Sequence, residues 1–150
     1  MKVMVMTGLL VFFLASCTSR EALVVKQFTV RETNPAWSED LLVRGEIQKR
    51  LYGAVEEKDR EQRRGQYYSV RWRADPAGGP VTVRFQYRQA ATGSRTQELK
   101  TSVAATEGTG VVEFAVAGDV FFKGGRVLAW RMLLSQNGQN LAEKRSFLWE

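Results

Sequence analysis

QYYSVRWRADPAGGPVTVRFQYRQ, residues 66–89, alternates apolar and polar side chains on both sides of a central turn. The apolar faces consist of Tyr68, Val70 and Trp72 in the first half and Val81, Val83, Phe85 and Tyr87 in the second. Alternation with a period of two is typical of half-buried β-strands. The segment between the halves, residues 75–80, is rich in proline and glycine and is typical of a turn. We therefore predict a β-hairpin whose apolar face lies in a core.

The same alternation continues along the chain and predicts one mainly β domain over residues 22–150. The predicted strands span residues 22–32, 66–73, 81–89, 96–103, 111–117, 126–134 and 141–149. In residues 126–134 the side chains predicted to face the core are Leu128, Trp130, Met132 and Leu134. Asn137-Gly138 is a pair that tight hairpin turns prefer. Seven or eight short strands with frequent turns indicate an antiparallel β-sandwich of immunoglobulin- or fibronectin-like layout. A small β-barrel is the alternative, because periodicity does not distinguish the two.

Residues 41–52 fit two patterns. Their apolar residues recur at every fourth position, as on a helix, yet several of them also share one face of a strand. Gly45 and Gly53 weaken the helical pattern, so a strand is predicted. Residues 54–64 are predicted to form the one short helix, since their acidic residues come first, their arginines come last and Gly65 follows as a cap.

Five polar residues are predicted to gather on the outward face of the 66–89 hairpin. They are Tyr67, Arg71, Arg73, Arg84 and Arg88. Arg71 and Arg84 would lie nearly opposite each other, which is unfavourable for like charges unless an acid or a ligand lies between them. Because arginine presents a fixed fork of donors, this face is a candidate surface for an anionic lipid, an acidic glycan or a partner's carboxylates. The alternative is a solvated face whose countercharge comes from Glu98 and Glu113.

GDVFFKGGR, residues 118–126, is predicted to be a loop that carries Phe121 and Phe122 between flanking glycines. The pair is a candidate aromatic tip for contact with a partner or with lipid headgroups. In the alternative, one ring fills the open end of the sandwich and the other covers the loop. The glycine spacing does not fit a phosphate-binding loop. Of the tryptophans only Trp37 falls on a predicted loop, so no sugar-stacking platform is predicted.

The chain contains no histidine, and this excludes several classes of enzyme. Histidine is the commonest general base and the commonest metal ligand. Histidine-dependent triads, histidine-ligated zinc hydrolase sites and haem ligation by histidine are therefore not available. No Ser-x-x-Lys sequence supplies a lysine base, and the acidic residues do not suggest a glycosidase pair. We predict that the protein is not an enzyme, with no catalytic residue, no metal site and no cofactor.

The N-terminal residues carry the features of a secretory signal peptide. Lys2 is followed by an apolar run from Val3 to Ala15, which is too short to span a bilayer, since spanning takes about 20 helical residues. The run ends in Leu-Ala-Ser-Cys at residues 14–17, and Cys17 is the only cysteine. A charged start, an apolar run and small residues before a cleavage site are typical of such peptides. Residues 14–17 resemble the lipobox of bacterial lipoproteins; the alternative is an ordinary signal peptide that ends near a cysteine.

The resemblance covers residues 1–17 and implies that residues 1–16 are removed and that the Cys17 thiol receives a diacylglyceryl group. Two or three acyl chains anchor a protein durably, because each buried CH₂ contributes about 0.8 kcal/mol. Thr18 stands where aspartate would favour the inner membrane, so the outer membrane, facing the periplasm, is expected in a cell with two membranes. Residues 17–21 form a short tether, of which residues 18–21 span roughly 13 Å. With Cys17 modified, no disulfide forms.

Charge and location together suggest a role in binding. The formal net charge is +6, and loss of Lys2 with the signal peptide lowers it to +5, which favours acidic partners. A secreted location makes nucleic acid the least expected of these. The sequence predicts a non-enzymatic adaptor at the cell envelope that binds an envelope protein, with an anionic glycan or lipid as further candidates. The alternative is a carrier or sensor of a small apolar or anionic ligand held between the sheets.

Replacement of Cys17 by serine tests the anchor. Since serine cannot form the thioether, we expect Cys17→Ser to move the protein from the membrane fraction to the soluble fraction after high-salt washing. Fractionation and immunoblotting measure the distribution. An identical distribution of the wild type and Cys17→Ser contradicts the lipobox assignment.

Overall fold

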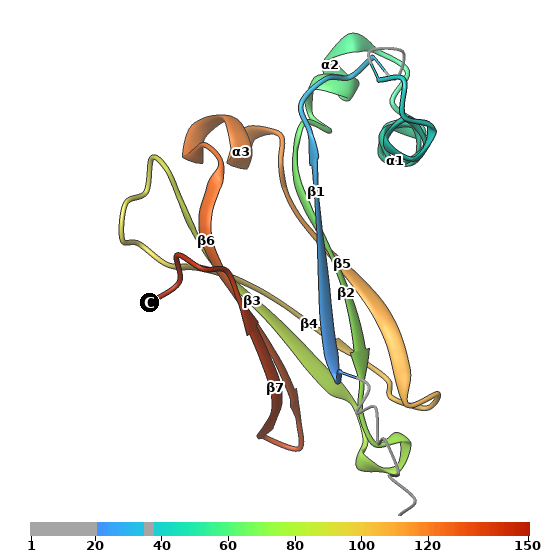
Figure 1. Ribbon diagram of the computed structural model, residues 1–150, viewed down its shortest axis with the longest axis vertical. Coiled ribbons are helices and arrows are strands. Elements are labelled where there is room, and N and C mark those ends of the chain that lie inside the picture. The colour runs from blue at the N-terminus through green and yellow to red at the C-terminus, as the bar shows by residue number, and fades with distance from the viewer. Residues whose placement is uncertain (1–20, 35–37) are drawn as a thin grey trace, which may run out of the picture.

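The computed structural model describes residues 21–34 and 38–150 (Figure 1). Its strands are β1 (Leu23–Val30), β2 (Gly65–Arg73), β3 (Val81–Gln89), β4 (Gln97–Val103), β5 (Thr109–Ala117), β6 (Val127–Gln136) and β7 (Gln139–Arg145). Its helices are α1 (Leu41–Leu51), α2 (Glu57–Glu61) and α3 (Asp119–Gly124), with a short 3₁₀ helix at Pro76–Gly78. The lipobox with Cys17, and Trp37, lie outside the described residues.

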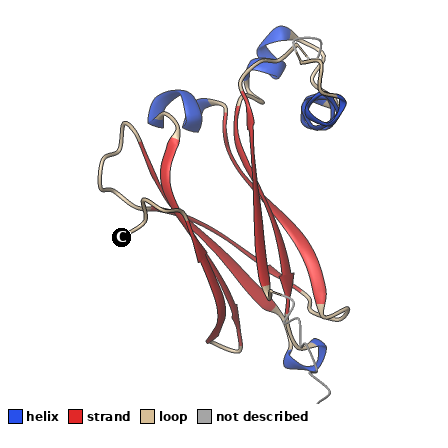
Figure 2. Cartoon of the chain, in the orientation of Figure 1, coloured by secondary structure: helices blue, strands red, loops and turns tan. Residues whose placement is uncertain are grey.

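The strands form two antiparallel sheets that face each other as layers (Figure 2). Sheet A has the strand order β1-β2-β5, and sheet B has the order β4-β3-β6-β7. The predicted β-sandwich is confirmed, and its seven strands match the lower of the two numbers expected. The barrel alternative is wrong, because no strand pairing joins the two sheets in the described part of the chain. Three helices accompany the sheets where one was predicted.

Aromatic side chains from the two sheets fill the space between them. The ring of Tyr68 on β2 lies 4.5 Å from Phe85 on β3 and 5.8 Å from Trp130 on β6, and Phe85 lies 5.5 Å from Phe114 on β5. Tyr68 and Phe85 are fully buried. The apolar faces predicted for residues 66–89 are therefore confirmed as core, since Val70, Trp72, Val81, Val83 and Tyr87 are buried there together with Tyr68 and Phe85. From other strands the core contains Leu23, Val116, Met132 and Leu134.

The predicted 66–89 hairpin is wrong, because β2 and β3 belong to different sheets. The chain crosses between them at Pro76–Gly78, where the Asp75 carboxylate accepts a hydrogen bond from the Ala77 amide at 2.9 Å. Gln136 holds the crossing from sheet B by donating to the Asp75 and Gly79 carbonyls, both at 2.8 Å. Two strands that pair and two strands that face each other across a core show the same alternation. The sequence pattern therefore did not distinguish the two arrangements.

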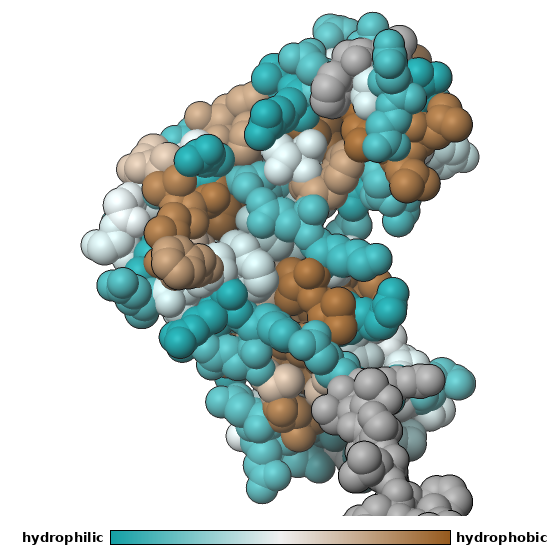
Figure 3. Space-filling view, viewed as in Figure 1, coloured by the Kyte–Doolittle hydropathy of each residue, from teal (hydrophilic) through white to brown (hydrophobic). Residues whose placement is uncertain are grey.

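Residues 41–52 were predicted as a strand, and this is wrong, since they form α1. The Asp40 carboxylate caps the first turn by accepting from the Leu42 and Val43 amides at 2.8 and 3.3 Å. Two basic residues lie in the last turn, where the helix dipole favours positive charge. The helical spacing was the correct signal: Ile47 is buried and Val43 and Leu51 are half-buried, whereas Leu42, which lies outside that spacing, is 82% exposed. Figure 3 shows apolar surface over α1 at its upper right.

Three other local predictions differ in part from the structure. Of residues 54–64 only α2 is helical, and the 118–126 segment contains α3 in place of a loop. Leu128 was predicted to face the core, but its side chain is 41% exposed. The β3–β6 register shifts beside it, and for this reason Val127 faces the core instead. Below this bulge Met132 and Leu134 are buried as predicted, while Trp130 packs partly buried against the core. The Asn137-Gly138 turn is confirmed, with both residues at positive φ.

The two ends of the sandwich differ. The described chain enters β1 at the end that also holds the Pro76–Gly78 crossing, at the bottom of Figure 1. Helices α1, α2 and α3 lie at the opposite end. The strands of both sheets therefore extend between the entry end and the helical end, in alternating directions. Within residues 21–34 and 38–150, no helix combines the length and apolar character that crossing a bilayer takes.

Tyr68 provides a test of the core. Its hydroxyl group is buried and has no hydrogen-bond partner among the described residues. We expect Tyr68→Phe to raise the free energy of unfolding by about 1 kcal/mol, because it removes an unpaired polar group. Tyr87→Phe is the matched control: Tyr87 donates to Gln97 at 3.4 Å, so its loss lowers stability by roughly 0.5 kcal/mol. Urea denaturation measures both, and a Tyr68→Phe protein less stable than wild type contradicts the expectation.

The same variant changes the response to alkali. Burial raises the pKa of Tyr68 above its ordinary value of 10.0. The unfolded chain therefore loses its tyrosine proton first as the pH rises above about 10, and the folded state loses stability there. We expect Tyr68→Phe to reduce this alkaline loss. Part of it remains, because burial also raises the pKa of Tyr67 and Tyr87. Thermal melting between pH 8 and 11 measures the difference.

Candidate functional site

The five residues predicted to share one face do not share it. Arg71 and Arg73 lie on the outer face of sheet A, whereas Arg84 and Arg88 lie on the outer face of sheet B. Tyr67 is 7% exposed and packs beneath α1. The single anion-binding face is therefore wrong. The separation of β2 and β3 into two sheets placed its members on opposite sides of the sandwich.

Sheet B gathers a different basic surface, which we call the sheet B arginine face. It consists of Arg84, Arg88, Lys100, Arg131 and Arg145. Arg84 lies directly opposite Lys100 in the β3–β4 pairing, and Arg131 lies opposite Arg145 in the β6–β7 pairing. Like charges in opposed positions destabilise a sheet. Within the described residues, no ion pair neutralises any of the five side chains.

Hydrogen bonds hold part of this face in a fixed geometry. The Gln86 side-chain oxygen accepts from Arg131 Nε and Nη2 at 2.9 and 2.6 Å. The Gln86 amide nitrogen donates to Glu98 at 2.8 Å, and Arg88 Nε donates to the Thr96 hydroxyl at 3.2 Å. Each guanidinium group keeps further N–H donors, since arginine carries five. The face thus presents oriented donors in addition to positive charge.

Trp149 packs onto the same face from the segment that follows β7. Its ring centroid lies 4.5 Å from the Arg88 guanidinium carbon and 5.2 Å from that of Arg131, within the range of cation–π attraction. The Ser146 hydroxyl fixes the start of the segment by accepting from the Trp130 amide at 2.9 Å. Trp149 is 6% exposed, whereas its neighbours Phe147 and Leu148 are 98% and 62% exposed. Two apolar side chains therefore accompany the arginines at the surface.

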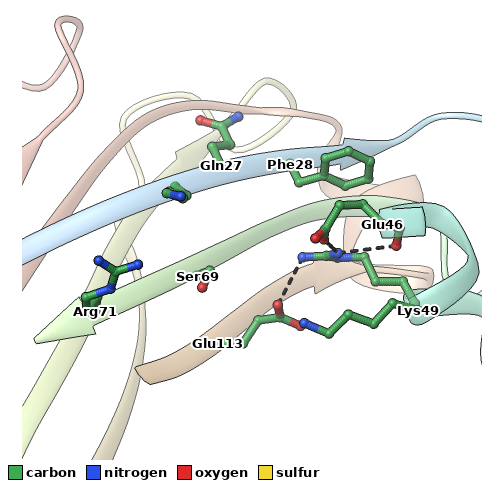
Figure 4. Close-up of a pocket in the computed structure, with 9 residues that line it drawn as sticks. Gln27, Phe28, Glu46, Lys49, Ser69, Arg71 and Glu113 are labelled. Carbon is green, nitrogen blue, oxygen red and sulfur yellow. Dashed lines mark hydrogen bonds and ion pairs between the residues drawn. The ribbon is translucent and has the colours of Figure 1, made fainter. Parts of the chain in front are cut away.

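Sheet A carries a second feature, the docking site of α1. The Arg50 guanidinium of α1 lies 4.9 Å from the Phe28 ring and 4.7 Å from the Tyr67 ring. It forms ion pairs with Glu46 on its own helix and, at 3.0 Å, with Glu113 on β5, as the dashed lines in Figure 4 show. Only 5% of the Arg50 side chain is exposed. Two aromatic rings and two carboxylates thus compensate a buried charge.

Burial raises the pKa of Tyr67 in this site, although the neighbouring Arg63 and Arg50 charges oppose the shift. Its hydroxyl group donates to the Arg63 carbonyl at 2.7 Å. The sequence prediction placed Tyr67 on an open surface and missed Arg50. The position of two basic residues in the last turn of a helix would have singled out Arg50, but the segment had been assigned as a strand.

A groove of about 360 Å³ runs beside α1 over sheet A (Figure 4). Lys26, Ser69 and Glu113 form one row across its floor, because Ser69 pairs with both of the others in the sheet register. Arg71 lies on the same strand face as Ser69, two residues further along β2. Acidic and basic side chains alternate in this groove. On the outer face of sheet B, Glu98 and Glu143 lie among five cationic side chains, so the excess of positive charge is larger there than in the groove.

Phe121 and Phe122 lie on α3 and contact each other edge to face, with ring centroids 6.1 Å apart. Phe122 is 46% exposed and lies 5.8 Å from the Arg64 guanidinium. Phe121 is half-buried and faces the open end of the sandwich. Phe121 therefore lines a cleft at this end and Phe122 stays partly exposed beside Arg64, and a contact of the pair with a partner or with lipid headgroups stays a prediction.

In the part of the chain that the structure describes, no three His, Cys, Asp or Glu side chains come together as metal ligands would. No protein-family model, curated protein or solved structure matches the chain.

The contribution of Arg50 to the docking of α1 can be measured directly. We expect Arg50→Ala to lower the free energy of unfolding of the helical end by about 2 kcal/mol, because it removes two aromatic contacts and two charged hydrogen bonds. Lys49→Ala is the matched control, since Lys49 is exposed on the same helix. Hydrogen exchange should show faster exchange of α1 amides in Arg50→Ala and an unchanged rate in Lys49→Ala. Equal exchange of α1 in the two variants contradicts the assigned role.

Proposed function

We propose that the protein is a lipid-anchored, non-enzymatic adaptor of the cell envelope that binds an acidic surface of another envelope protein through the sheet B arginine face. The observation that carries the proposal is the set of five cationic side chains on one sheet face, none of which forms an ion pair within the described residues. Opposed like charges cost stability in the free protein. A partner that supplies carboxylates relieves this repulsion on binding.

The neighbouring side chains favour a protein over a bilayer or a glycan. Phe147 and Leu148 are exposed beside the arginines, and arginine together with aromatic residues is the composition typical of protein–protein interfaces. The proposed anchor at Cys17 is four residues from Glu21, so it places the entry end of β1 nearest the membrane. Sheet B runs along the long axis away from that end (Figure 1). Its face therefore points sideways, toward a neighbouring protein.

The same arrangement supports the proposed location. A short tether keeps the domain at the membrane surface, and residue 18 favours the outer membrane facing the periplasm in a cell with two membranes. The far, helical end is then turned away from the bilayer. An adaptor needs no catalytic group, which agrees with a chain that lacks histidine.

Charge reversal on the two sheets tests the proposal. The test variant is Arg84→Glu/Lys100→Glu/Arg145→Glu, whose three side chains form no hydrogen bond or ion pair among the described residues. The matched control is Lys26→Glu/Arg71→Glu/Arg73→Glu, which changes the net charge equally on the outer face of sheet A. A photo-crosslinking residue replaces Ser102, an exposed position of β4 beside the face. Crosslinking is performed in native membranes and analysed by mass spectrometry.

We expect the protein that carries only the photo-crosslinking residue, and the control variant, each to crosslink to one discrete partner protein. The test variant should lose this crosslink. Reversing three charges should weaken binding by at least about 100-fold if each contact contributes about 1 kcal/mol. Crosslinking that is equal in both charge variants overturns the proposal. So does crosslinking to lipid alone, because it replaces the protein partner by the membrane itself.

A further inference from the structure

On β1, β2 and β3 the inward side chains change from apolar to polar at one level near the helical end. Along β1 the inward residues are first Leu23 and Val25 and then Gln27 and Thr29. Along β2, followed toward the same end, they are Trp72, Val70 and Tyr68 and then Gln66. On β3 the apolar inward residues end at Gln89. Polar side chains therefore share this level with Val116 and Val127, which lie opposite Gln66 and Gln89 and remain in the core.

Gln66 and Gln89 occupy this level and differ in one respect. Gln89 is 1% exposed and fully used: it donates to the Val120 and Gly125 carbonyls at 3.0 and 2.8 Å and accepts from Gln97 at 2.9 Å. Gln66 is 5% exposed, and its side-chain oxygen accepts from the Val127 amide at 2.5 Å. Its amide nitrogen forms no hydrogen bond within the described residues. This buried residue thus retains two N–H donors that reach solvent instead of a protein acceptor.

These donors line a cleft of about 520 Å³ between β1, β2, α3 and the start of β6. Arg31 and Arg126 lie at its rim, and Gln27 and Thr29 line its β1 side. No acidic side chain is among its described lining residues. Phe121 forms an apolar wall, with its ring held against that of Phe122. The volume falls within the range of pockets that take small organic ligands, roughly 300–1,000 Å³.

We propose that this cleft binds a small organic acid. The carboxylate accepts hydrogen bonds from the Gln66 amide and from the guanidinium groups of Arg31 and Arg126, which match its planar geometry. The apolar body of the acid packs against Phe121. The site uses no residue of the sheet B arginine face, so it is independent of the adaptor role. It lies at the open end of the sandwich and not in a closed barrel.

The test uses the full-length, ¹⁵N-labelled protein in detergent micelles, with benzoate as the probe. Benzamide is the control ligand, because it has the same shape without the charge. We expect benzoate to cause saturable shifts at the Gln66 side-chain amide and the Val127 backbone amide, and benzamide to cause none. Arg126→Gln should raise the Kd for benzoate at least about 10-fold, as expected for loss of a charged hydrogen bond.

Arg95→Gln is the matched control variant, since it removes one exposed arginine that belongs neither to the cleft nor to the sheet B arginine face, and its Kd should equal that of wild type. Arg126→Gln should not disturb the fold, because the Arg126 side chain is exposed. The Arg126 backbone carbonyl accepts a hydrogen bond from the Ala90 amide, and the variant retains this bond. Arg31→Gln provides a second variant with the same expected loss. Equal shifts with benzoate and benzamide, or an unchanged Kd in both arginine variants, overturn the proposal. Saturable binding of inorganic phosphate without binding of benzoate also overturns it.

Discussion

The contact between the aromatic side chains of sheets A and B is the interaction on which the rest of the structure depends. Tyr68, Phe85, Phe114 and Trp130 bring the two layers into contact with ring centroids 4.5 to 5.8 Å apart. Aromatic side chains bury more apolar area than any others. Because no disulfide is available to a chain with one cysteine, this burial holds the sandwich together. It also forces β2 and β3 into separate sheets, since each needs its apolar face covered by the other layer.

This division of β2 from β3 determines where the charges lie. It separates Arg71 from Arg84 and brings Arg84 beside Lys100, and Arg131 beside Arg145. The outer face of sheet A is covered in part by α1, where Arg50 is compensated by two carboxylates and two rings. No helix covers sheet B in the described part of the chain. Three of its cationic side chains, Arg84, Lys100 and Arg145, form no hydrogen bond or ion pair among the described residues, whereas the buried charge on sheet A serves the fold.

The polar level above the core follows from the same construction. The apolar layers close the sandwich at the entry end, and at the helical end glutamine and threonine face inward beside the core residues Val116 and Val127. On the β3 side, Gln89 satisfies the backbone of α3. On the β1 side, the donors of Gln66 remain unused within the described residues and face a cleft. One sandwich therefore offers two distinct surfaces, a broad cationic sheet face and a small polar cleft.

The sequence by itself determined the strands, most of the core faces and the lack of histidine chemistry, because alternation fixes which side of a strand each residue faces. It did not determine which strand lies beside which, since pairing partners and facing partners share one pattern; Arg71 and Arg84 were misplaced for this reason. Nor did it reveal α1, because Gly45 and Gly53 weighed against the helical spacing of its apolar residues, whereas in the structure the Asp40 cap and the buried Arg50 stabilise the helix. Only the tertiary structure joined Arg131, Arg145 and Lys100 to Arg84 and Arg88, because strands distant in sequence become neighbours only when the sheets form.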